Sequence, residues 1–231
     1  MQIKGHMGWY DTVFTCQPFT FRTIHELLKI EETMGYHDPQ YYASLHWSRI
    51  FEYPWVYATI QPEKDDIILD LGGGWGPLQL YLAQRCKRVY NFDMDGGIIP
   101  FLEASERTLG IYNVTLNLGD AVNGLPYEDC FFDKVVILSV LEHMSPPYQR
   151  YLDEVLRVTK VGGIIACTLD VCIESGEHKE MISVDTVKEL CGNLGVRWVD
   201  PMMTTPMGRL VESGHMKTFA VMTLALQKVS V

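Results

Sequence analysis

Short apolar segments alternate along most of the chain with longer segments in which apolar residues recur at helical spacing. Short apolar runs bounded by glycine or acidic residues are typical of buried parallel strands, whereas helical spacing is typical of amphipathic helices. The strand-like segments are Ile67–Leu71, Arg88–Asp95, Val114–Leu118, Phe132–Leu138 and Ile164–Val171. Their alternation with helix-like segments predicts an α/β fold around a mostly parallel sheet.

Four segments have apolar residues at helical spacing, and two of them are bounded by a residue typical of a helix start or a helix end. Helices are expected over the segments that share this spacing, namely Leu78–Ala83, Gly97–Leu109, Tyr148–Thr159 and Ser183–Leu194. Pro77 suits a first helical position and Gly195 a helix end. Short strands are expected over Val196–Val199 and Thr218–Lys228, and the proline-containing residues 200–217 are expected to form a loop that borders the pocket.

The first 62 residues differ from the rest, because they contain three of the five tryptophans. The segments Thr20–Met34 and Gln40–Thr59 have helical periodicity, with Pro54 expected to kink or end the second helix. This composition predicts a helical cap over residues 1–62 that supplies substrate contacts, followed by a domain over residues 63–231. The alternative is that these aromatic residues only pack the helices onto the sheet.

The stretch after Ile67–Leu71 reads Gly72, Gly73, Gly74, Trp75, Gly76 and Pro77. Glycines allow positive φ angles and close approach of a ligand, and the following helix start presents free N–H groups, so the stretch predicts a nucleotide site. A dinucleotide fingerprint would place a third glycine where Pro77 stands. A phosphate-binding P-loop would need a lysine, and none lies between Lys64 and Lys87.

The net charge of −10 and a pI near 5.1, without a run of lysine or arginine, argue against a nucleic-acid partner. No stretch approaches the roughly 18 to 20 apolar residues of a membrane span, and the N-terminus lacks a signal pattern. We therefore expect a soluble, cytoplasmic protein without a membrane partner. The six cysteines form no C-x-x-C pair, which favours buried free thiols.

The remaining pattern, Asp70-x-Gly72-x-Gly74-x-Gly76, resembles the first motif of class I S-adenosylmethionine-dependent methyltransferases. The block from Leu125 to His143 resembles the fourth-strand region of the small-molecule methyltransferases often called type 11. The resemblance implies a Rossmann-like sheet of seven strands with an antiparallel last strand, helices on both faces, and S-adenosyl-L-methionine as cofactor. Trp47–Trp55 looks like the segment preceding the first motif in some methyltransferases of bacterial sugar pathways.

Three acids follow successive expected strands. Asp93 lies 21 residues beyond Gly72, close to the spacing at which an acid reaches ribose hydroxyls. The resemblance implies that Asp120 accepts a hydrogen bond from the adenine amino group, while Asp95 could cap the next helix. The full set expected to bind the cofactor is Asp70, Gly72, Gly73, Gly74, Asp93, Met94, Asp120, Ala121 and Ser139.

His143, just past the fourth expected strand, is the candidate catalytic base, because a histidine is available as a base near neutral pH. The alternative is that it only packs at the strand end. Some relatives hold a metal with a Glu-x-x-Glu-His pattern here, but Ser139 replaces the first Glu and leaves only Glu142 with the histidine. We therefore expect no metal site.

These observations predict a methyltransferase that acts on a small-molecule acceptor, a hydroxylated metabolite such as a sugar or polysaccharide precursor. Two other functions stay open. A protein of the same fold could bind the cofactor as a sensor or scaffold without turnover, and an NAD-dependent oxidoreductase is disfavoured by Pro77. The acceptor atom and the oligomeric state are not defined by the sequence.

Overall fold

A single sheet forms the centre of the molecule, for which the computed structural model describes residues 18–34, 49–144, 146–172, 182–192, 196–199, 203–212 and 215–229. Its main path runs β3-β2-β1-β4-β5-β9-β7, with β6 paired to β5 and β8 paired to β9. The strands are β1 (Ile67–Leu71), β2 (Arg88–Asp93), β3 (Val114–Leu118), β4 (Phe132–Leu138), β5 (Thr159–Cys172), β6 (Ile182–Ser183), β7 (Val196–Trp198), β8 (Met203–Glu212) and β9 (His215–Lys228).

Strands β1 to β5 are parallel to one another, and β9 runs antiparallel beside β5. This confirms the predicted mostly parallel, Rossmann-like sheet with an antiparallel last strand. Because parallel strands point the same way, the carboxyl ends of β1 to β5 lie along one edge, where ligands of open α/β sheets bind.

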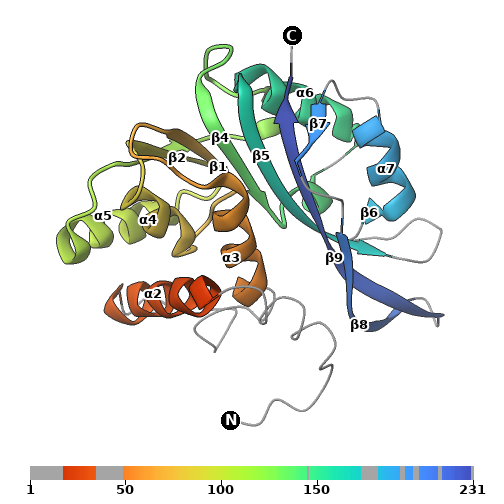
Figure 1. The fold of residues 1–231 in the computed structure, drawn as a ribbon, viewed down its shortest axis with the longest axis horizontal. Coiled ribbons are helices and arrows are strands. Elements are labelled where there is room, and N and C mark those ends of the chain that lie inside the picture. Colours follow the sequence, from red (N-terminus) through yellow and green to blue (C-terminus); the bar gives the residue numbers. More distant parts are fainter. Residues whose placement is uncertain are drawn as a thin grey trace.

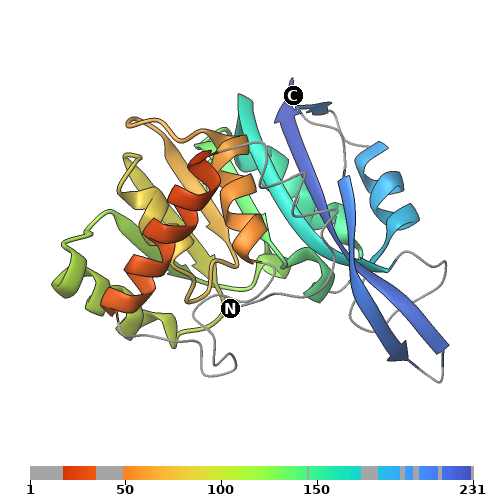
Figure 2. The same ribbon diagram turned by 60° about the horizontal axis from the view of Figure 1, so that its bottom comes forward.

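Helices cover both faces of the sheet (Figures 1 and 2). One face carries α2 (Pro18–Met34), α3 (Arg49–Ile60), α4 (Leu78–Ala83) and α5 (Ile98–Leu109), and the other carries α6 (Tyr148–Val158) and α7 (Val184–Gly192). Each face has its own apolar core. The short 3₁₀ turns η1 (Ala121–Asn123) and η2 (Leu141–His143) follow β3 and β4 at the ligand-binding edge.

The two N-terminal helices pack directly on the body of the protein. Leu27, Val56 and Ile60 are fully buried and belong to the same core as Ile68 of β1. Pro54 lies inside α3, which continues to Ile60 and is not ended there. The role of the aromatic residues as a substrate cap, and the boundary between residues 1–62 and 63–231, stay predictions.

The region expected to be a loop over residues 200–217 is different in the structure, because Met203–Glu212 forms β8 of a hairpin with β9. The register shifts between Pro206 and Gly208, which is how an edge strand accommodates proline. The expected helical turns over 40–48, the segment after Cys172 and the helix end at Gly195 lie outside the described residues.

The expectation about membranes was tested against the helices. In the part of the chain that the structure describes, no helix is both long and apolar enough to cross a bilayer.

Candidate active site

A cavity of about 400 Å³ opens at the carboxyl edge of the sheet. Its walls come from the ends of β1 and β2, from the segments that follow β1 to β4, and from Tyr151 of α6, and they include the start of the glycine loop. The lining residues are Leu71, Gly72, Phe92, Asp93, Met94, Gly119, Asp120, Ala121, Val122, Ser139, Val140, His143, Met144 and Tyr151. Seven of the ten predicted site residues therefore line one cavity, namely Gly72, Asp93, Met94, Asp120, Ala121, Ser139 and His143.

Gly72 is the first residue of the glycine loop, and its position has no room for a side chain. Its φ angle is +69°, and a Cβ atom there would lie 2.5 Å from Val140 Cγ2. Its backbone N–H donates to the carbonyl oxygen of Phe92 at 2.8 Å. The residue therefore joins the ends of β1, β2 and β4 at the floor of the cavity.

Asp93, the last residue of β2, accepts hydrogen bonds from the loop after β1 and from the loop after β2. Its Oδ2 accepts from the N–H of Gly74 at 3.0 Å, and its Oδ1 accepts from the N–H of Asp95 at 2.9 Å. A carboxylate has further lone pairs, so these bonds leave acceptor capacity toward the cavity. Asp95 Oδ1 accepts from the N–H of Gly97 at 2.8 Å, and Gly97 is itself the N-cap residue of α5, so Asp95 holds the turn before the helix and not the helix's own first N–H groups.

Asp120 follows β3 at the neighbouring wall of the cavity. Its Oδ1 accepts from the N–H of Val122 at 2.9 Å and so caps η1. The carboxylate is exposed, and the apolar side chains of Met94 and Ala121 line the cavity with it. This combination of a hydrogen-bond acceptor and apolar surface suits a planar base that carries an amino group.

Asp70, Gly73 and Gly74 do not line the cavity but support it. A Cβ atom on Gly73 would lie 2.6 Å from Asp70 Oδ2, so the loop folds directly over this buried carboxylate. Burial raises the pKa of Asp70 to about 7, and the nearby charge of Asp93 acts in the same direction. The carbonyl oxygen of Gly74 accepts from Gln79 Nε2 at 2.8 Å, which fixes the far side of the loop.

Ser139, directly after β4, connects the cavity to α3. Its φ angle is +49°, an unusual backbone conformation for a residue with a side chain. Its Oγ accepts from Arg49 Nη1 at 2.9 Å and donates to Glu52 Oε1 at 3.0 Å. Arg49 also pairs closely with Glu52, whose Oε1 accepts from Thr168 Oγ1 at 2.5 Å.

This buried polar cluster was not predicted from the sequence. A signal was present, since Arg49 and Glu52 are the only charged residues of the otherwise apolar helix α3. Charged residues in such a helix are expected to pair when buried. Their partners Ser139, directly after β4, and Thr168 on β5 lie 90 and 116 residues further along the chain, too far for a local pattern to reveal.

Two more acids lie beside this cluster. Glu142 of η2 is buried, and its Oε1 accepts from the N–H of Asp170 at 2.8 Å, whereas its Oε2 has no hydrogen-bond partner among the residues that the structure describes. Burial raises the pKa of Glu142 to about 8 and that of Asp170 to about 6. The negative charge of Glu52 contributes to both increases in pKa.

His143, the candidate base, is exposed at the end of η2 and lines the cavity. Its backbone N–H donates to the carbonyl oxygen of Val140 at 3.0 Å, which holds the turn. Within the described ranges, no group of three or more His, Cys, Asp or Glu residues could hold a metal ion.

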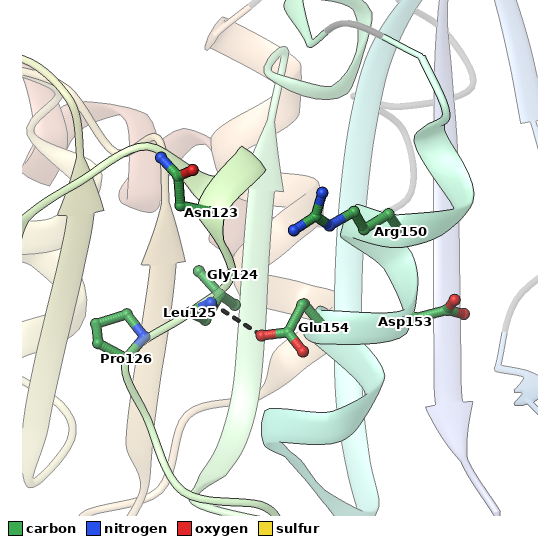
Figure 3. Close-up of a pocket in the computed structure, with 7 residues that line it drawn as sticks. All are labelled: Asn123, Gly124, Leu125, Pro126, Arg150, Asp153 and Glu154. Atoms are coloured by element: carbon green, nitrogen blue, oxygen red, sulfur yellow. Dashed lines mark hydrogen bonds between the residues drawn. The ribbon is translucent and has the colours of Figure 1, made fainter.

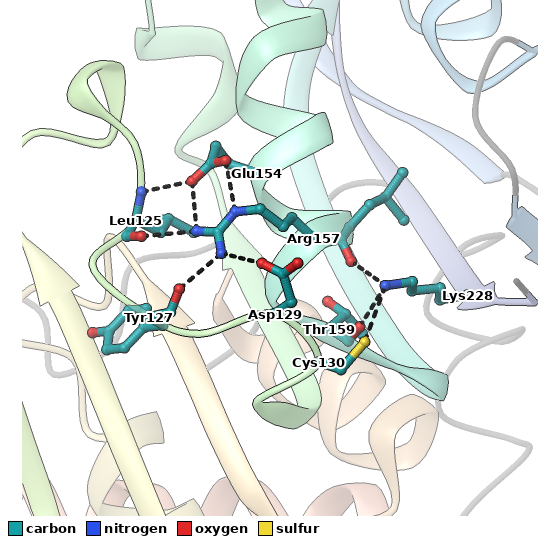
Figure 4. A network of polar contacts seen from close by, with 9 residues as sticks. Leu125, Tyr127, Asp129, Cys130, Glu154, Arg157, Thr159 and Lys228 are labelled. Atoms are coloured by element: carbon teal, nitrogen blue, oxygen red, sulfur yellow. Dashed lines mark hydrogen bonds and ion pairs between the residues drawn. The ribbon is translucent and has the colours of Figure 1, made fainter. Parts of the chain in front are cut away.

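A second cavity of about 420 Å³ lies between η1 and α6 (Figure 3). Its acid Glu154 is already engaged, because Oε2 accepts from the N–H of Leu125 at 2.9 Å and both oxygens bond Arg157. Arg157 also binds Asp129 at 2.7 Å, and nearby Lys228 donates to the carbonyl oxygens of Leu156 and Thr159 (Figure 4). These contacts tie the segment before β4 to α6, so Glu154 and Leu125 in the wall of this cavity have a structural role.

The first cavity fits S-adenosylmethionine. The carboxylates of Asp93 and Asp120 at the ends of adjacent strands match ribose hydroxyls and an adenine amino group, which both need acceptors. The acidic side chains in the wall are these two carboxylates, and no lysine or arginine is among the described residues that line it, which suits a cationic sulfonium.

Comparisons with known proteins agree with this chemistry. Residues 69–167 match the family described as "Methyltransferase domain". A protein-L-isoaspartate O-methyltransferase of Paracoccus denitrificans is 33% identical over 100 residues, which cover 43% of each chain. A demethylmenaquinone methyltransferase of Thermobifida fusca is 32% identical over 144 residues, which cover 62% of this chain and 57% of the relative.

In three dimensions, the crystal structure of a SAM-dependent methyltransferase from Aquifex aeolicus shares the fold, with a TM-score of 0.54 at 22% identity. The match covers 85% of this chain and 97% of that one. This chain spans about half the length of the curated relatives it matches first. The matched residues 69–167 resemble a methyltransferase domain and include every residue that lines the first cavity, which fits S-adenosylmethionine.

Proposed function

We propose that this protein transfers the methyl group of S-adenosylmethionine to an oxygen of a small hydroxylated metabolite, such as a free or nucleotide-linked sugar or a polysaccharide precursor. The observation that carries the proposal is the position of His143, which lines the same cavity as Asp93 and Asp120 but follows a different strand. A base placed away from the cofactor's acids can face an acceptor that enters from the side of β4.

His143 has a defined task in this proposal. S-adenosylmethionine supplies an electrophilic methyl group whose sulfur leaves as a neutral thioether. A hydroxyl group is a weak nucleophile, so removal of its proton by an imidazole nitrogen increases its reactivity. Holding acceptor and methyl group in line can supply about 7 to 11 kcal/mol of the barrier.

The charge of the protein and one group of its relatives support a small acceptor. The cavity of about 400 Å³ lies within the range for small-molecule sites, roughly 300 to 1,000 Å³, which suits the cofactor. The net charge of −10 disfavours phosphate-rich polymers, so we also propose that nucleic acid is not a substrate. As a separate proposal, the protein works in the cytoplasm. A relative named for demethylmenaquinone supports a small acceptor, whereas relatives named for protein isoaspartate provide the main competing acceptor class.

The test is formation of S-adenosylhomocysteine from S-adenosylmethionine with a panel of acceptors. The panel contains free sugars, nucleotide-linked sugars, a quinol and an isoaspartyl peptide, with a reaction lacking acceptor as background. Turnover with a hydroxylated small molecule and a methyl ether in the product would support the proposal. Turnover with the isoaspartyl peptide alone would contradict it, and cofactor binding without turnover on any acceptor would favour a sensor or scaffold.

A further inference from the structure

We propose that Trp75 is a positioning residue for the cofactor, because its indole ties the glycine loop after β1 to the loop after β2 and thereby holds the carboxylate of Asp93. Trp75 is not among the residues that line the cavity, so it acts through residues that do. The inference rests on the proposed function, from which it takes S-adenosylmethionine as the cofactor and nothing about the acceptor.

The glycine loop has a single side chain that can anchor it. Every other residue from Gly72 to Gly76 is a glycine, so only Trp75 can reach a neighbouring element with a side chain. Its Nε1 donates to Asp95 Oδ2 at 2.9 Å, and its ring lies near that of Phe101 on α5, with the ring centroids 6.5 Å apart. The loop after β1 is therefore tied to the loop after β2 and to the helix that follows it.

The contact with Asp95 closes a ring of hydrogen bonds around Asp93. Gly74, which directly precedes Trp75, donates its N–H to Asp93 Oδ2 at 3.0 Å, and Asp95 donates its N–H to Asp93 Oδ1 at 2.9 Å. The two residues that orient the Asp93 carboxylate are thus joined to each other through the indole. Because its two donors are fixed relative to each other, the carboxylate keeps its remaining lone pairs in one direction and is preorganised for ribose hydroxyls.

Gly97 provides the space that the indole occupies. A Cβ atom at Gly97 would lie 2.9 Å from Cζ2 of Trp75 and 2.9 Å from Oδ1 of Asp95, closer than side chains approach one another. The φ angle of Gly97 is −63°, which any residue adopts, so the backbone conformation does not require a glycine. Room for the indole is therefore what the glycine supplies at this position.

The other anchors of the glycine loop act on its inner side. The carbonyl oxygen of Gly74 accepts from Gln79 Nε2 at 2.8 Å and from Asn91 Nδ2 at 3.2 Å, and both of these side chains are buried. They hold the loop to α4 and β2 without the help of the indole. Loss of the Trp75 contact should therefore leave the fold intact and release only the link toward Asp95.

The first test is a pair of substitutions that remove the same bond. Trp75→Phe keeps an aromatic ring without the N–H donor, and Asp95→Asn leaves one acceptor oxygen for the two donors that the carboxylate served. We expect each to weaken binding of S-adenosylhomocysteine roughly 3- to 10-fold in calorimetry, as for one hydrogen bond. The double variant should lose no more than the larger single loss. Additive losses, or unchanged dissociation constants, would overturn the proposal.

A second ligand separates the positioning of Asp93 from general support of the loop. The analogue of S-adenosylhomocysteine that lacks both ribose hydroxyls cannot use the Asp93 carboxylate. Trp75→Phe should therefore weaken binding of this analogue less than about twofold, which is small against the loss expected for S-adenosylhomocysteine. Equal losses for the two ligands would make Trp75 a general support of the loop and would contradict its action through Asp93.

Two neighbouring glycines offer a matched pair in which no hydrogen-bonding group is removed. Gly97→Ala places a Cβ atom against the indole, whereas at Gly96 the nearest heavy atom of a described residue, apart from the chain neighbours, is Leu118 Cδ1 at 3.7 Å. Gly97→Ala should weaken binding of S-adenosylhomocysteine about as much as Trp75→Phe, and Gly96→Ala should change it less than about twofold. Equal effects of the two alanines, or the opposite order, would contradict the proposal.

The unaltered protein shows which assignment has failed. If it does not bind S-adenosylhomocysteine, the cofactor assignment of the proposed function is overturned, and this inference with it. If it binds S-adenosylhomocysteine and none of the variants changes the affinity, the inference alone is overturned.

Discussion

The candidate site has two halves that are built in different ways: the β2–β3 side of the cavity, and a β4–β5 half formed by Ser139 and the buried polar cluster behind it. On the β2–β3 half, Asp93 and Asp120 accept hydrogen bonds from backbone N–H groups, most of them two residues away. On the β4–β5 half, Ser139 and Thr168 bond side chains of a helix that precedes them by 90 and 116 residues. The first half is local loop geometry, and the second half depends on the tertiary packing of α3.

The difference affects what each half can do. Carboxylates held by backbone N–H groups keep open lone pairs and suit the recognition of a ligand's donors. The β4–β5 half instead holds several acids around one arginine in a buried place, where charge is costly, and the pKa of Glu142 is raised to about 8. We expect changes in the first half to alter cofactor affinity, and changes in the second half to alter turnover and the pH dependence of stability.

The largest expected effect is on turnover through His143. His143→Gln should lower kcat by about 10² to 10⁴ if the acceptor must lose a proton, while the dissociation constant for S-adenosylhomocysteine stays close to that of the unaltered protein. The measurement is steady-state kinetics beside calorimetry. His25→Gln, an exposed histidine on α2, is the control and should leave both quantities unchanged. Loss of cofactor affinity with unchanged kcat would make His143 a packing residue.

On the β2–β3 half, Asp93→Ala should weaken cofactor binding by about 1.5 to 3 kcal/mol, the range for hydrogen bonds to a charged group. The substitution also releases the N–H groups of Gly74 and Asp95, so both loops lose their anchor. Calorimetric titration with S-adenosylhomocysteine measures the effect, and Asp185→Ala on the exposed side of α7 is the control. An unchanged dissociation constant would remove Asp93 from the site.

How well the sequence predicted each half follows from these contacts. The glycine loop, Asp93 and Asp120 depend on residues close in sequence, and the strand–turn pattern was sufficient to locate them. The contacts of Ser139 with Arg49 and Glu52 depend on how α3 docks onto the sheet, which no periodicity specifies. Strand β8 was missed for a related reason, because Pro206 and Gly208 read locally as a loop while pairing with β9 forms the strand.

The pH dependence of stability tests the β4–β5 half. Because the folded pKa of Glu142 is above the unfolded value near 4.3, the folded state holds a proton that the unfolded state has released, and stability falls from about pH 4.3 to pH 8. Glu142→Gln keeps an acceptor for the Asp170 N–H and removes this loss. The variant should therefore gain free energy of unfolding over the unaltered protein as the pH rises. This gain should be about 1 to 2 kcal/mol larger at pH 8 than at pH 5, measured by urea unfolding.

Glu154 is the control for that measurement, because Arg157 lowers its pKa. An acid with a lowered folded pKa stabilises the fold above its unfolded pKa, and this contribution is lost as pH falls through the folded pKa. Glu154→Gln should therefore lower stability at neutral pH and approach the unaltered protein in acid. If both substitutions changed the free energy of unfolding with the same sign at pH 8 relative to pH 5, the electrostatic difference between Glu142 and Glu154 would be contradicted.

The smallest expected effect is a difference in unfolding free energy between two alanine substitutions in the glycine loop, of which only one contacts the segment after β4. Gly72 and Gly74 both have positive φ angles, +69° and +52°, so an alanine is strained at either position. At Gly72 the new Cβ atom would also clash with Val140 after β4. At Gly74, no heavy atom of a described residue other than the two chain neighbours lies within 4 Å of the Cβ position. Gly72→Ala should therefore cost about 1 kcal/mol more in unfolding free energy than Gly74→Ala. The additional substitution Val140→Ala should recover part of that difference in the Gly72→Ala background and none in the Gly74→Ala background. Equal costs for the two glycine variants would mean that Val140 yields freely, and that the floor of the cavity does not join β1 to β4 as tightly as the contact indicates.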